Sequence, residues 1–152
     1  IDREMSLVKS YVAIEQARFE ERLKVVYEID ESVDCLVPPL SIQPLVENAI
    51  RHGVTHRLHG GTVAIRVEQE DRVVCITVED DGVGIPEERL HGLFARPRDQ
   101  SGVGLMNIHQ RMLRLYGNGL DIRSEPGIGT KVTLRIPNES GGSYDQSDTH
   151  RR

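Results

Sequence analysis

The sequence predicts an α+β fold, a two-layer α/β sandwich in which one mixed sheet carries helices on one face. Two observations lead to this prediction. Three stretches place apolar residues at the three- and four-residue spacing of an amphipathic helix, and five shorter stretches have the composition of strands. Their order is helix, strand, helix, two strands, helix and a closing hairpin, and no internal repeat is visible. This order indicates one domain.

The elements are expected where apolar patterns and stop signals agree. Helices are expected at residues 3–23, 42–54 and 103–116, with a short helical piece at 87–90. Strands are expected at residues 24–29, 62–69, 72–79, 119–125 and 130–136. Ser41 is a suitable N-cap for the second helix. Glu70 and Asp71 supply the turn between the second and third strands. Val73 and Cys75 make the third strand apolar on both faces, as in the centre of a sheet.

Bulk properties exclude several classes of protein. The chain has 152 residues, enough for one domain with a core, and its net charge of −5 argues against nucleic acid as a partner. No apolar run approaches the roughly 20 residues of a membrane span, and no signal peptide is visible. Cys35 and Cys75 are isolated, which fits a reducing cytoplasm. The six His residues lack the spacing of a zinc site.

The helix expected at 42–54 has a polar face that can hold phosphate and a metal ion. Asn48 and His52 lie one turn apart on this face, beside Glu47 and Arg51. An Asn oxygen is a neutral hard ligand that suits Mg²⁺, while Arg51 and His52 can hold phosphate oxygens. The same residues also describe an ordinary solvated face with a Glu47–Arg51 pair. For this helix alone, the solvated face is the favoured interpretation.

A second block follows the apolar third strand. Asp80 comes directly before a turn that contains Gly82 and Gly84. A carboxylate there can accept a hydrogen bond from an exocyclic amine, and the glycines let a planar ring approach the backbone, which fits adenine recognition. The alternatives are an ordinary β-turn and a Ca²⁺ loop. The Ca²⁺ pattern fails because no further acidic residues follow at alternating positions.

The third block opens the helix expected at 103–116. Gly102 and Gly104 leave backbone N–H groups free to bind an anion at the helix start. A Rossmann site fits poorly because no strand directly precedes the glycines, and a P-loop is excluded because no Gly-Lys-Ser/Thr occurs. Between the second and third blocks lies an irregular segment that is expected to form a lid over the phosphates. Its arginines are Arg89, Arg96 and Arg98.

Together, the three blocks resemble the ATP-binding catalytic domain of bacterial LytS-like sensor histidine kinases, in the GHKL (Bergerat-fold) superfamily. PLSIQPLVENAIRHG, residues 39–53, resembles the N box of that family. DDGVGIP at residues 80–86 resembles its G1 box, and GVGLMNIHQR at residues 102–111 its G2 box. GTKVTLRIP at residues 129–137 and YVAIEQARF at residues 11–19 are also similar to the family. The resemblance therefore covers about residue 5 to residue 137.

The resemblance implies a site for ATP and Mg²⁺. Asn48 would bind Mg²⁺, and Arg51 and His52 would approach the phosphates. Asn48 and Glu47 are the candidate catalytic residues, since an acidic residue at this point has been given a base-like role in kinases. Asp80 would accept the adenine amine. The remaining nucleotide-binding residues would be Gly82, Gly84, Gly102, Gly104, Leu105 and Thr130.

The function implied is transfer of the ATP γ-phosphate to a His in an upstream dimerisation domain, and then to a response regulator. Residues 1–23 would be a helix leading from that absent region, 24–137 the catalytic domain and 138–152 a disordered tail. The domain would be cytoplasmic, in a parent protein that is a membrane-anchored homodimer. No nucleic acid partner is expected.

One departure from related ATPases bears on the reaction. Gyrase and chaperone ATPases use a Glu four residues before the Mg²⁺-binding Asn to activate water, and Pro44 stands there in this chain. Hydrolysis is therefore expected to be poor, and transfer to a docked acceptor is favoured. Two alternatives remain: an anti-sigma-factor-like Ser/Thr kinase of the same superfamily, and a non-catalytic nucleotide-sensing module.

Overall fold

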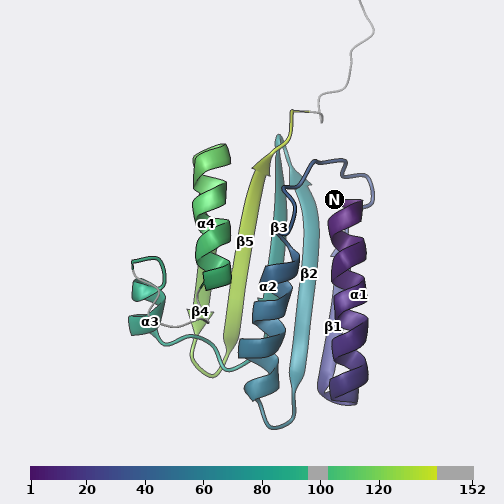
Figure 1. Cartoon of the computed structure of the whole chain (residues 1–152), viewed down its shortest axis with the longest axis vertical. Coiled ribbons are helices and arrows are strands. Elements are labelled where there is room, and N and C mark those ends of the chain that lie inside the picture. The colour runs from purple at the N-terminus through teal and green to yellow at the C-terminus, as the bar shows by residue number, and fades with distance from the viewer. Residues whose placement is uncertain (96–102, 140–152) are drawn as a thin grey trace, which may run out of the picture.

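The fold is built on one mixed five-stranded sheet (Figure 1). The computed structural model describes residues 1–95 and 103–139. The strands are β1 (Leu23–Ile29), β2 (Gly61–Glu70), β3 (Val73–Asp80), β4 (Asp121–Glu125) and β5 (Gly129–Pro137). Their order in the sheet is β1-β2-β3-β5-β4, with β1 parallel to β2 and the other neighbours antiparallel. The α+β class and the mixed sheet are confirmed.

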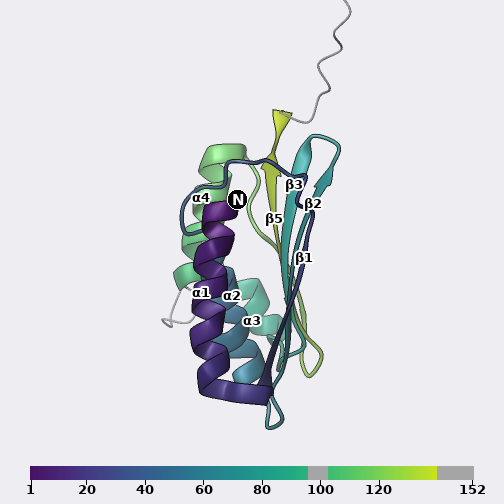
Figure 2. The same cartoon turned by 90° about the vertical axis from the view of Figure 1, so that its right-hand side faces the viewer.

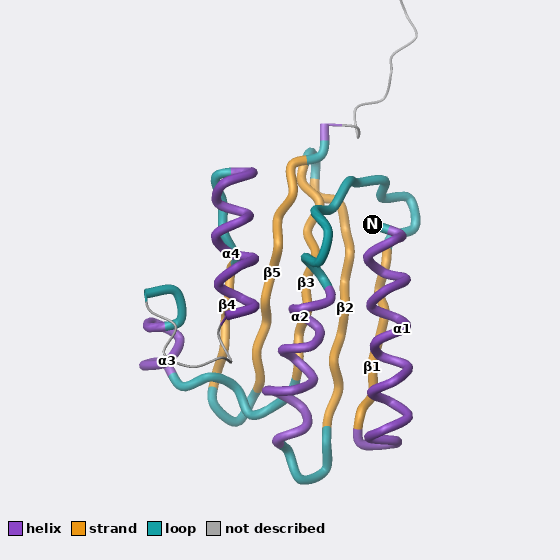
Figure 3. The backbone as a smooth tube through the Cα atoms, viewed as in Figure 1, coloured by secondary structure: helices purple, strands orange, loops and turns teal. Residues whose placement is uncertain are grey.

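Helices cover one face of this sheet. They are α1 (Asp2–Phe19), α2 (Gln43–Asn48), α3 (Glu87–Gly92) and α4 (Val103–Tyr116). Figure 2 shows the sheet nearly edge-on, with α1, α2 and α4 on the same side of it. Figure 3 shows the long loop that leaves β1, passes over the end of the sheet and descends into α2. The two-layer sandwich with helices on one face is therefore confirmed.

The core lies between the helices and the sheet, and the predicted apolar positions fill it. The third predicted strand is β3, which lies at the centre of the sheet, and both of its faces are largely buried. The apolar arc of the second predicted helix is also buried, from Ile42 through Ile50. Side chains with less than 2% exposure come from every layer: Val8, Ile42, Leu45, Ile65, Ile76, Met112 and Leu134.

Several local predictions need correction. The first helix ends at Phe19, and a 3-10 turn occupies Glu20–Arg22. Ser41 does not cap α2, because its hydroxyl donates to the Pro38 carbonyl over 2.6 Å. No side chain of the cap residue itself bonds the first turn of α2. In the hairpin between β2 and β3, the turn is at Asp71 and the next residue, with Asp71 in the left-handed region at φ 53°.

The end of the domain also differs from the prediction. The sequence predicts a disordered tail from Asn138 onward, but Asn138 is only 6% exposed. Its backbone N–H donates to the Arg72 carbonyl over 2.7 Å. Its side-chain amide donates to the Asp34 carbonyl and to Gln69. Asn138 therefore closes the end of the β2–β3 hairpin, and the rest of the predicted tail from residue 140 lies outside the described residues.

The two cysteines are both buried and neither forms a disulfide. Burial raises the pKa of the Cys35 thiol and of the Cys75 thiol, so neither is a reactive thiolate near neutral pH. Among the helices of the described part of the chain, none has the length and apolar character needed to cross a bilayer.

Candidate functional site

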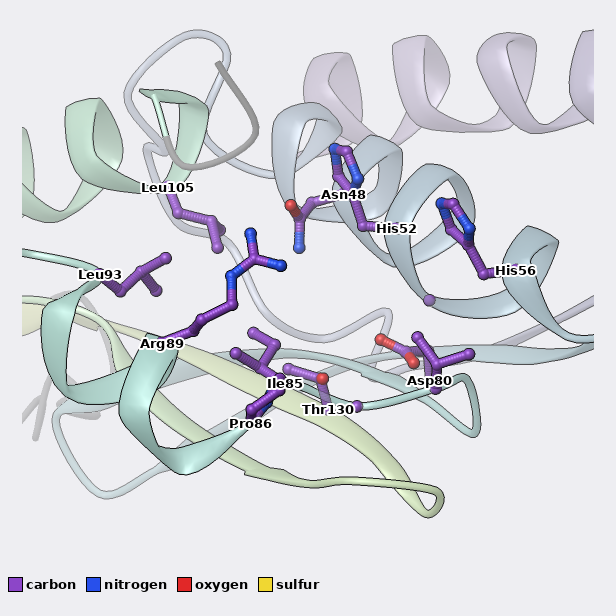
Figure 4. Close-up of a pocket in the computed structure, with 13 residues that line it drawn as sticks. Asn48, His52, His56, Asp80, Ile85, Pro86, Arg89, Leu93, Leu105 and Thr130 are labelled. Atoms are coloured by element: carbon purple, nitrogen blue, oxygen red, sulfur yellow. The ribbon is translucent and has the colours of Figure 1, made fainter. Parts of the chain in front are cut away.

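A cavity of about 480 Å³ lies where α2, α3 and α4 meet the ends of β3 and β5 (Figure 4). This volume is within the range of small-molecule sites, roughly 300–1,000 Å³. Its lining comes from all three sequence blocks and from the hairpin between β4 and β5. The lining residues are Asn48, His52, Gly53, His56, Asp80, Val83, Gly84, Ile85, Pro86, Arg89, Leu93, Leu105 and Thr130.

Asp80 supplies a buried carboxyl at the floor of the cavity. It ends the central strand β3 and is 6% exposed. The Gly82 backbone N–H donates to its Oδ1 over 2.9 Å. Burial raises the pKa of Asp80 to about 6, and the neighbouring Asp81 carboxylate also raises it, against the hydrogen bond from Gly82. The group is therefore ionised at neutral pH but close to its titration range.

Gly53 makes room for this carboxyl. A Cβ at position 53 would lie 2.5 Å from Asp80 Oδ1, which is closer than real contacts allow. Gly82 is equally constrained, since a Cβ there would lie 2.2 Å from the Gly53 carbonyl carbon. The end of the N-box segment and the G1 turn thus pack backbone to backbone. This contact brings two distant blocks of sequence to one site.

The α2 wall departs from the regular helix predicted for residues 42–54. The α-helical bonding covers Gln43–Asn48, a π-helical segment follows at Ala49–Gly53, and a 3-10 turn at Val54–His56 completes the wall. Short π-helical segments are rare in proteins, and those that occur are often found at functional sites. Here it ends at Gly53, where the chain meets Asp80. Only the hydrogen-bonding pattern of the segment differs from the predicted helix, since its apolar side is buried as predicted.

Of the residues predicted for the site on this wall, some line the cavity and others lie outside it. Asn48 and His52 line the cavity, and the His56 ring stacks with the His52 ring at a centroid distance of 6.4 Å. Arg51 is exposed and lies outside the lining. Glu47 also lies outside it, and its Oε1 accepts a hydrogen bond from the Gln43 amide over 3.2 Å. Burial lowers the pKa of His52, and Arg51, His56 and Arg89 lower it further.

The floor continues into the G1 turn and β5. Gly84 lines the cavity with φ 71°, and a Cβ there would lie 2.2 Å from the Glu125 carbonyl oxygen. Gly82 contributes through packing and lies outside the lining. Thr130 is 7% exposed and stands beside Asp80 in the β3–β5 register. Its hydroxyl is 2.7 Å from the Ser124 hydroxyl, so the β4–β5 hairpin holds it in place.

The opposite wall comes from α3 and the start of α4. Figure 4 shows Arg89 reaching from α3 into the space between Leu105 and Asn48. Leu105 is 2% exposed and lines the cavity, whereas Gly104 is exposed and a Cβ there would meet open space. Of the other predicted lid and phosphate residues, Gly102, Arg96 and Arg98 lie outside the described residues.

Some lining residues were not predicted, although weak signals for them exist. Ile85 and Pro86 follow the glycine pair directly, and His56 is one turn beyond His52 on the same segment. Leu93 directly follows α3, where the sequence predicts only a short helical piece at 87–90. Ile85, Pro86 and Leu93 add apolar surface to a cavity that also contains the Asp80 carboxyl and the Arg89 guanidinium. An elongated ligand with a planar apolar part and an anionic end matches this distribution.

The fold and the cavity together define a class of protein, the ATP-binding domains of the histidine kinase type. Residues 39–140 match the family described as histidine kinase-, DNA gyrase B- and HSP90-like ATPases. The chain belongs to this family. The resemblance to LytS-like sensor histidine kinases that the three motifs predicted is also confirmed by sequence relatives.

Three of these relatives are sensor proteins of bacteria. Sensor histidine kinase YpdA of Escherichia coli is 45% identical over 140 residues, which are 91% of this chain and 24% of YpdA. Sensor histidine kinase YesM of Bacillus subtilis is 39% identical over 140 residues, 90% of this chain and 23% of YesM. Sensor protein LytS of Bacillus anthracis is 37% identical over 147 residues, 93% of this chain and 25% of LytS. The chain thus spans about a quarter of the length of these relatives.

Solved structures agree with the fold. The histidine kinase domain of the blue-light activated kinase EL346 of Erythrobacter litoralis has a TM-score of 0.62 at 26% identity. The match covers 83% of this chain and 56% of that one. The catalytic domain of histidine kinase ThkA, in a nucleotide-free form, has a TM-score of 0.67 at 20% identity, covering 88% and 90%. The catalytic domain of a histidine kinase therefore has the same architecture as this chain.

Proposed function

We propose that the cavity binds ATP with its adenine on Asp80 and its phosphates between α2 and Arg89. The observation that carries this proposal is the buried Asp80 carboxyl at the floor, with the cationic Arg89 and the imidazole of His52 farther along the cavity. The ionised carboxyl accepts a hydrogen bond from the adenine amino group. Thr130 and Gly84 border the base.

The other end of the cavity suits a triphosphate. Arg89 reaches into it and can form charge-assisted hydrogen bonds with phosphate oxygens. His52, whose lowered pKa keeps its ring neutral at pH 7, can donate one N–H to phosphate. We also propose that Arg51, Gly82, Gly102 and Gly104 support the nucleotide from outside the described lining, as the family motifs imply.

The donor set also fits Mg²⁺ bound mainly through phosphate. Asn48 lines the cavity and carries a neutral amide oxygen, and no group of three His, Cys, Asp or Glu side chains in the described part of the chain forms a cage for a metal. Mg²⁺ usually keeps several waters and takes few protein ligands. Asn48 would hold the ion, which when bound neutralises charge on the transferred phosphoryl group.

We propose that the reaction is phosphoryl transfer to a His of an upstream dimerisation domain. An imidazole nitrogen of the acceptor forms a bond to the γ-phosphorus, the bond to the bridging oxygen breaks, and ADP leaves. This chain contributes by orienting the nucleotide and by stabilising charge. Glu47 remains a candidate base next to Asn48. Pro44 offers no group to activate water, so hydrolysis is slow.

We further propose the setting of the parent protein. The relatives are sensor proteins about four times as long as the matched region. The parent would be a membrane-anchored homodimer that holds this domain on the cytoplasmic side, and it would pass the phosphoryl group to a response regulator. Alone, the chain is expected to bind ATP without phosphorylating itself.

Binding of a non-hydrolysable ATP analogue, measured by calorimetry with and without Mg²⁺, tests the site. Asp80→Ala is expected to weaken binding with or without Mg²⁺, whereas Asn48→Ala should weaken only the Mg²⁺-dependent part. Arg114→Gln, an exposed change on α4, is the control. Parental affinity in both site variants would show that the nucleotide binds elsewhere.

A second experiment tests the acceptor. The chain is mixed with the dimerisation segment of its parent protein and radiolabelled ATP. Label that is lost in acid but kept in base identifies phosphohistidine. Acid-stable label would instead support the Ser/Thr kinase alternative, and tight binding without any transfer would support a nucleotide-sensing module.

A further inference from the structure

The segment that leads into α2 is held on one side by a carboxyl from α1. Glu4 is only 5% exposed. Its Oε1 accepts the backbone N–H of Leu40 over 2.7 Å. Its Oε2 accepts the N–H groups of Ser41 and Ile42, each over 3.1 Å. These bonds satisfy three consecutive backbone donors directly before the first helical residue of α2, and the acceptor comes from a residue far away in sequence.

The same segment is held on its other side by a guanidinium from α4. Arg111 donates from Nη1 to the Pro39 carbonyl over 2.7 Å. It donates from Nη2 to the Leu40 carbonyl over 3.0 Å and to the Ser41 hydroxyl over 2.8 Å. Leu40 has φ 56°, a conformation that a Leu rarely adopts alone. The segment's shape is therefore imposed by Glu4 and Arg111.

This junction connects the two walls of the cavity. The segment continues directly into α2, which carries Asn48. Arg111 stands on α4, whose first turn carries Leu105 of the opposite wall. Figures 1 and 3 show α1, α2 and α4 side by side on the sheet, with the segment reaching α2 from above. A helix transmits displacement along its length, so a shift of the segment relative to α4 changes the separation of Asn48 and Leu105.

We infer that Glu4 and Arg111 are positioning residues, which set the spacing of Asn48 and Leu105 across the cavity. Through Glu4, the position of α1 is coupled to the geometry of the cavity. The inference rests on the proposed function in one respect, namely that the cavity binds the nucleotide. Glu4 and Arg111 lie outside the lining and act only through the segment between them.

The test compares Glu4→Gln and Arg111→Lys with the exposed control changes Glu21→Gln and Arg114→Gln. Glu4→Gln keeps the side-chain shape but loses one acceptor oxygen. Arg111→Lys keeps the positive charge but loses the paired Nη1 and Nη2 donors of the guanidinium. All variants are studied at a temperature where urea denaturation shows them fully folded. The dissociation constant for the Mg²⁺–ATP analogue is expected to rise by about fivefold or more in each positioning variant, and to stay at the parental value in the controls.

A second readout needs no nucleotide. The NMR signals of the Asn48 side-chain amide and the Leu105 methyl groups are expected to shift together in both positioning variants and in neither control. The double variant should bind little more weakly than either single variant, because both act through one segment. Should Glu4→Gln fail to fold, Arg111→Lys carries both readouts.

The outcomes separate this inference from the proposed function. If the parent chain itself fails to bind the analogue, the proposed function is wrong, and the NMR comparison still decides the coupling. If the variants lose stability but keep the parental dissociation constant and the parental Asn48 and Leu105 signals, Glu4 and Arg111 only stabilise the fold. That result would overturn the inference.

Discussion

Replacing Asp80 by Asn is expected to stabilise the folded domain at neutral pH while it weakens nucleotide binding. Asp80 is 6% exposed, and burial raises its pKa from 3.8 to about 6. Asn has nearly the same shape and keeps an oxygen for the Gly82 N–H, but it carries no charge. The substitution therefore removes the cost of burying an ionised group and leaves the local packing in place.

The magnitude and its pH dependence follow from proton linkage. Well below pH 3.8 the carboxyl is protonated in the folded and the unfolded chain, so it has no effect on stability. Between pH 4 and 6 the folded chain binds the extra proton, and its stability falls as the pH rises. Above pH 6 the full cost applies, and a rise in pKa from 3.8 to about 6 corresponds to roughly 3 kcal/mol. Asp80→Asn is thus expected to gain about 2–3 kcal/mol at pH 7.5 and only about 0.5 kcal/mol at pH 4.

Urea denaturation of the parent and of Asp80→Asn at both pH values measures this difference. Asp81→Asn is the matched control, because Asp81 is exposed and its Oδ1 accepts the Thr62 N–H over 2.7 Å. Asp81→Asn removes only the smaller contribution of Asp81 to the raised pKa of Asp80 and also loses a charged acceptor for the Thr62 N–H, so it should stabilise the chain much less than Asp80→Asn. In parallel, loss of the charged acceptor in Asp80→Asn should weaken binding of the ATP analogue by about tenfold or more. Equal or lower stability of Asp80→Asn at pH 7.5, or a gain that is the same at both pH values, would refute the reasoning.

Three further predictions concern the site and the packing around it. Asn48→Ala should bring the ratio of the ATP-analogue dissociation constants without and with Mg²⁺ close to one, and calorimetry that finds the parental ratio would contradict the metal assignment. Gly129→Ala should lower the free energy of unfolding, measured by urea titration, by about 3 kcal/mol or more. The reason is that φ is 144° and a Cβ would lie 1.9 Å from the Asp80 carbonyl oxygen. Gly127→Ala is the control, and it should lower the free energy of unfolding by only about 1 kcal/mol, because φ is 80° but the space around it is open. Met112→Ala should lose about 2–5 kcal/mol, since this side chain is fully buried, and a smaller loss in thermal unfolding would indicate that the core collapses around it.

The sequence predicts the parts of this structure that depend on local periodicity. The limits of α4 match the prediction because its apolar spacing is a local signal and a glycine, Gly117, directly follows the helix, as is common at a helix C-terminus. The central place of β3 follows from its lack of a polar face. The family motifs predict that Asp80 and Asn48 share one site, and both residues line the cavity. Periodicity alone favours a solvated face for Asn48.

Features that depend on distant contacts could not be predicted. Ser41 has the right chemistry for a cap, but its hydroxyl donates to the Pro38 carbonyl, and the Glu4 carboxyl holds the backbone N–H groups of Ser41 and Ile42. The π-helical segment at Ala49–Gly53 ends where Gly53 meets the Asp80 carboxyl, which is a tertiary contact. Asn138 belongs to a polar stretch, yet it is buried by bonds to the loop after β1 and to β2. In each case a partner from another part of the chain overrides the local preference.

The burial of both native thiols opens a route to site-specific spectroscopy. A single cysteine introduced at an exposed position such as Glu88 on α3 would be the only readily alkylated one among the described residues, since Cys35 and Cys75 are protected in the core. The chain also has no tryptophan, so a fluorophore attached there would be read without background from indole. Such a label would report ligand binding in the cavity in real time, and the buried native cysteines would not need to be replaced.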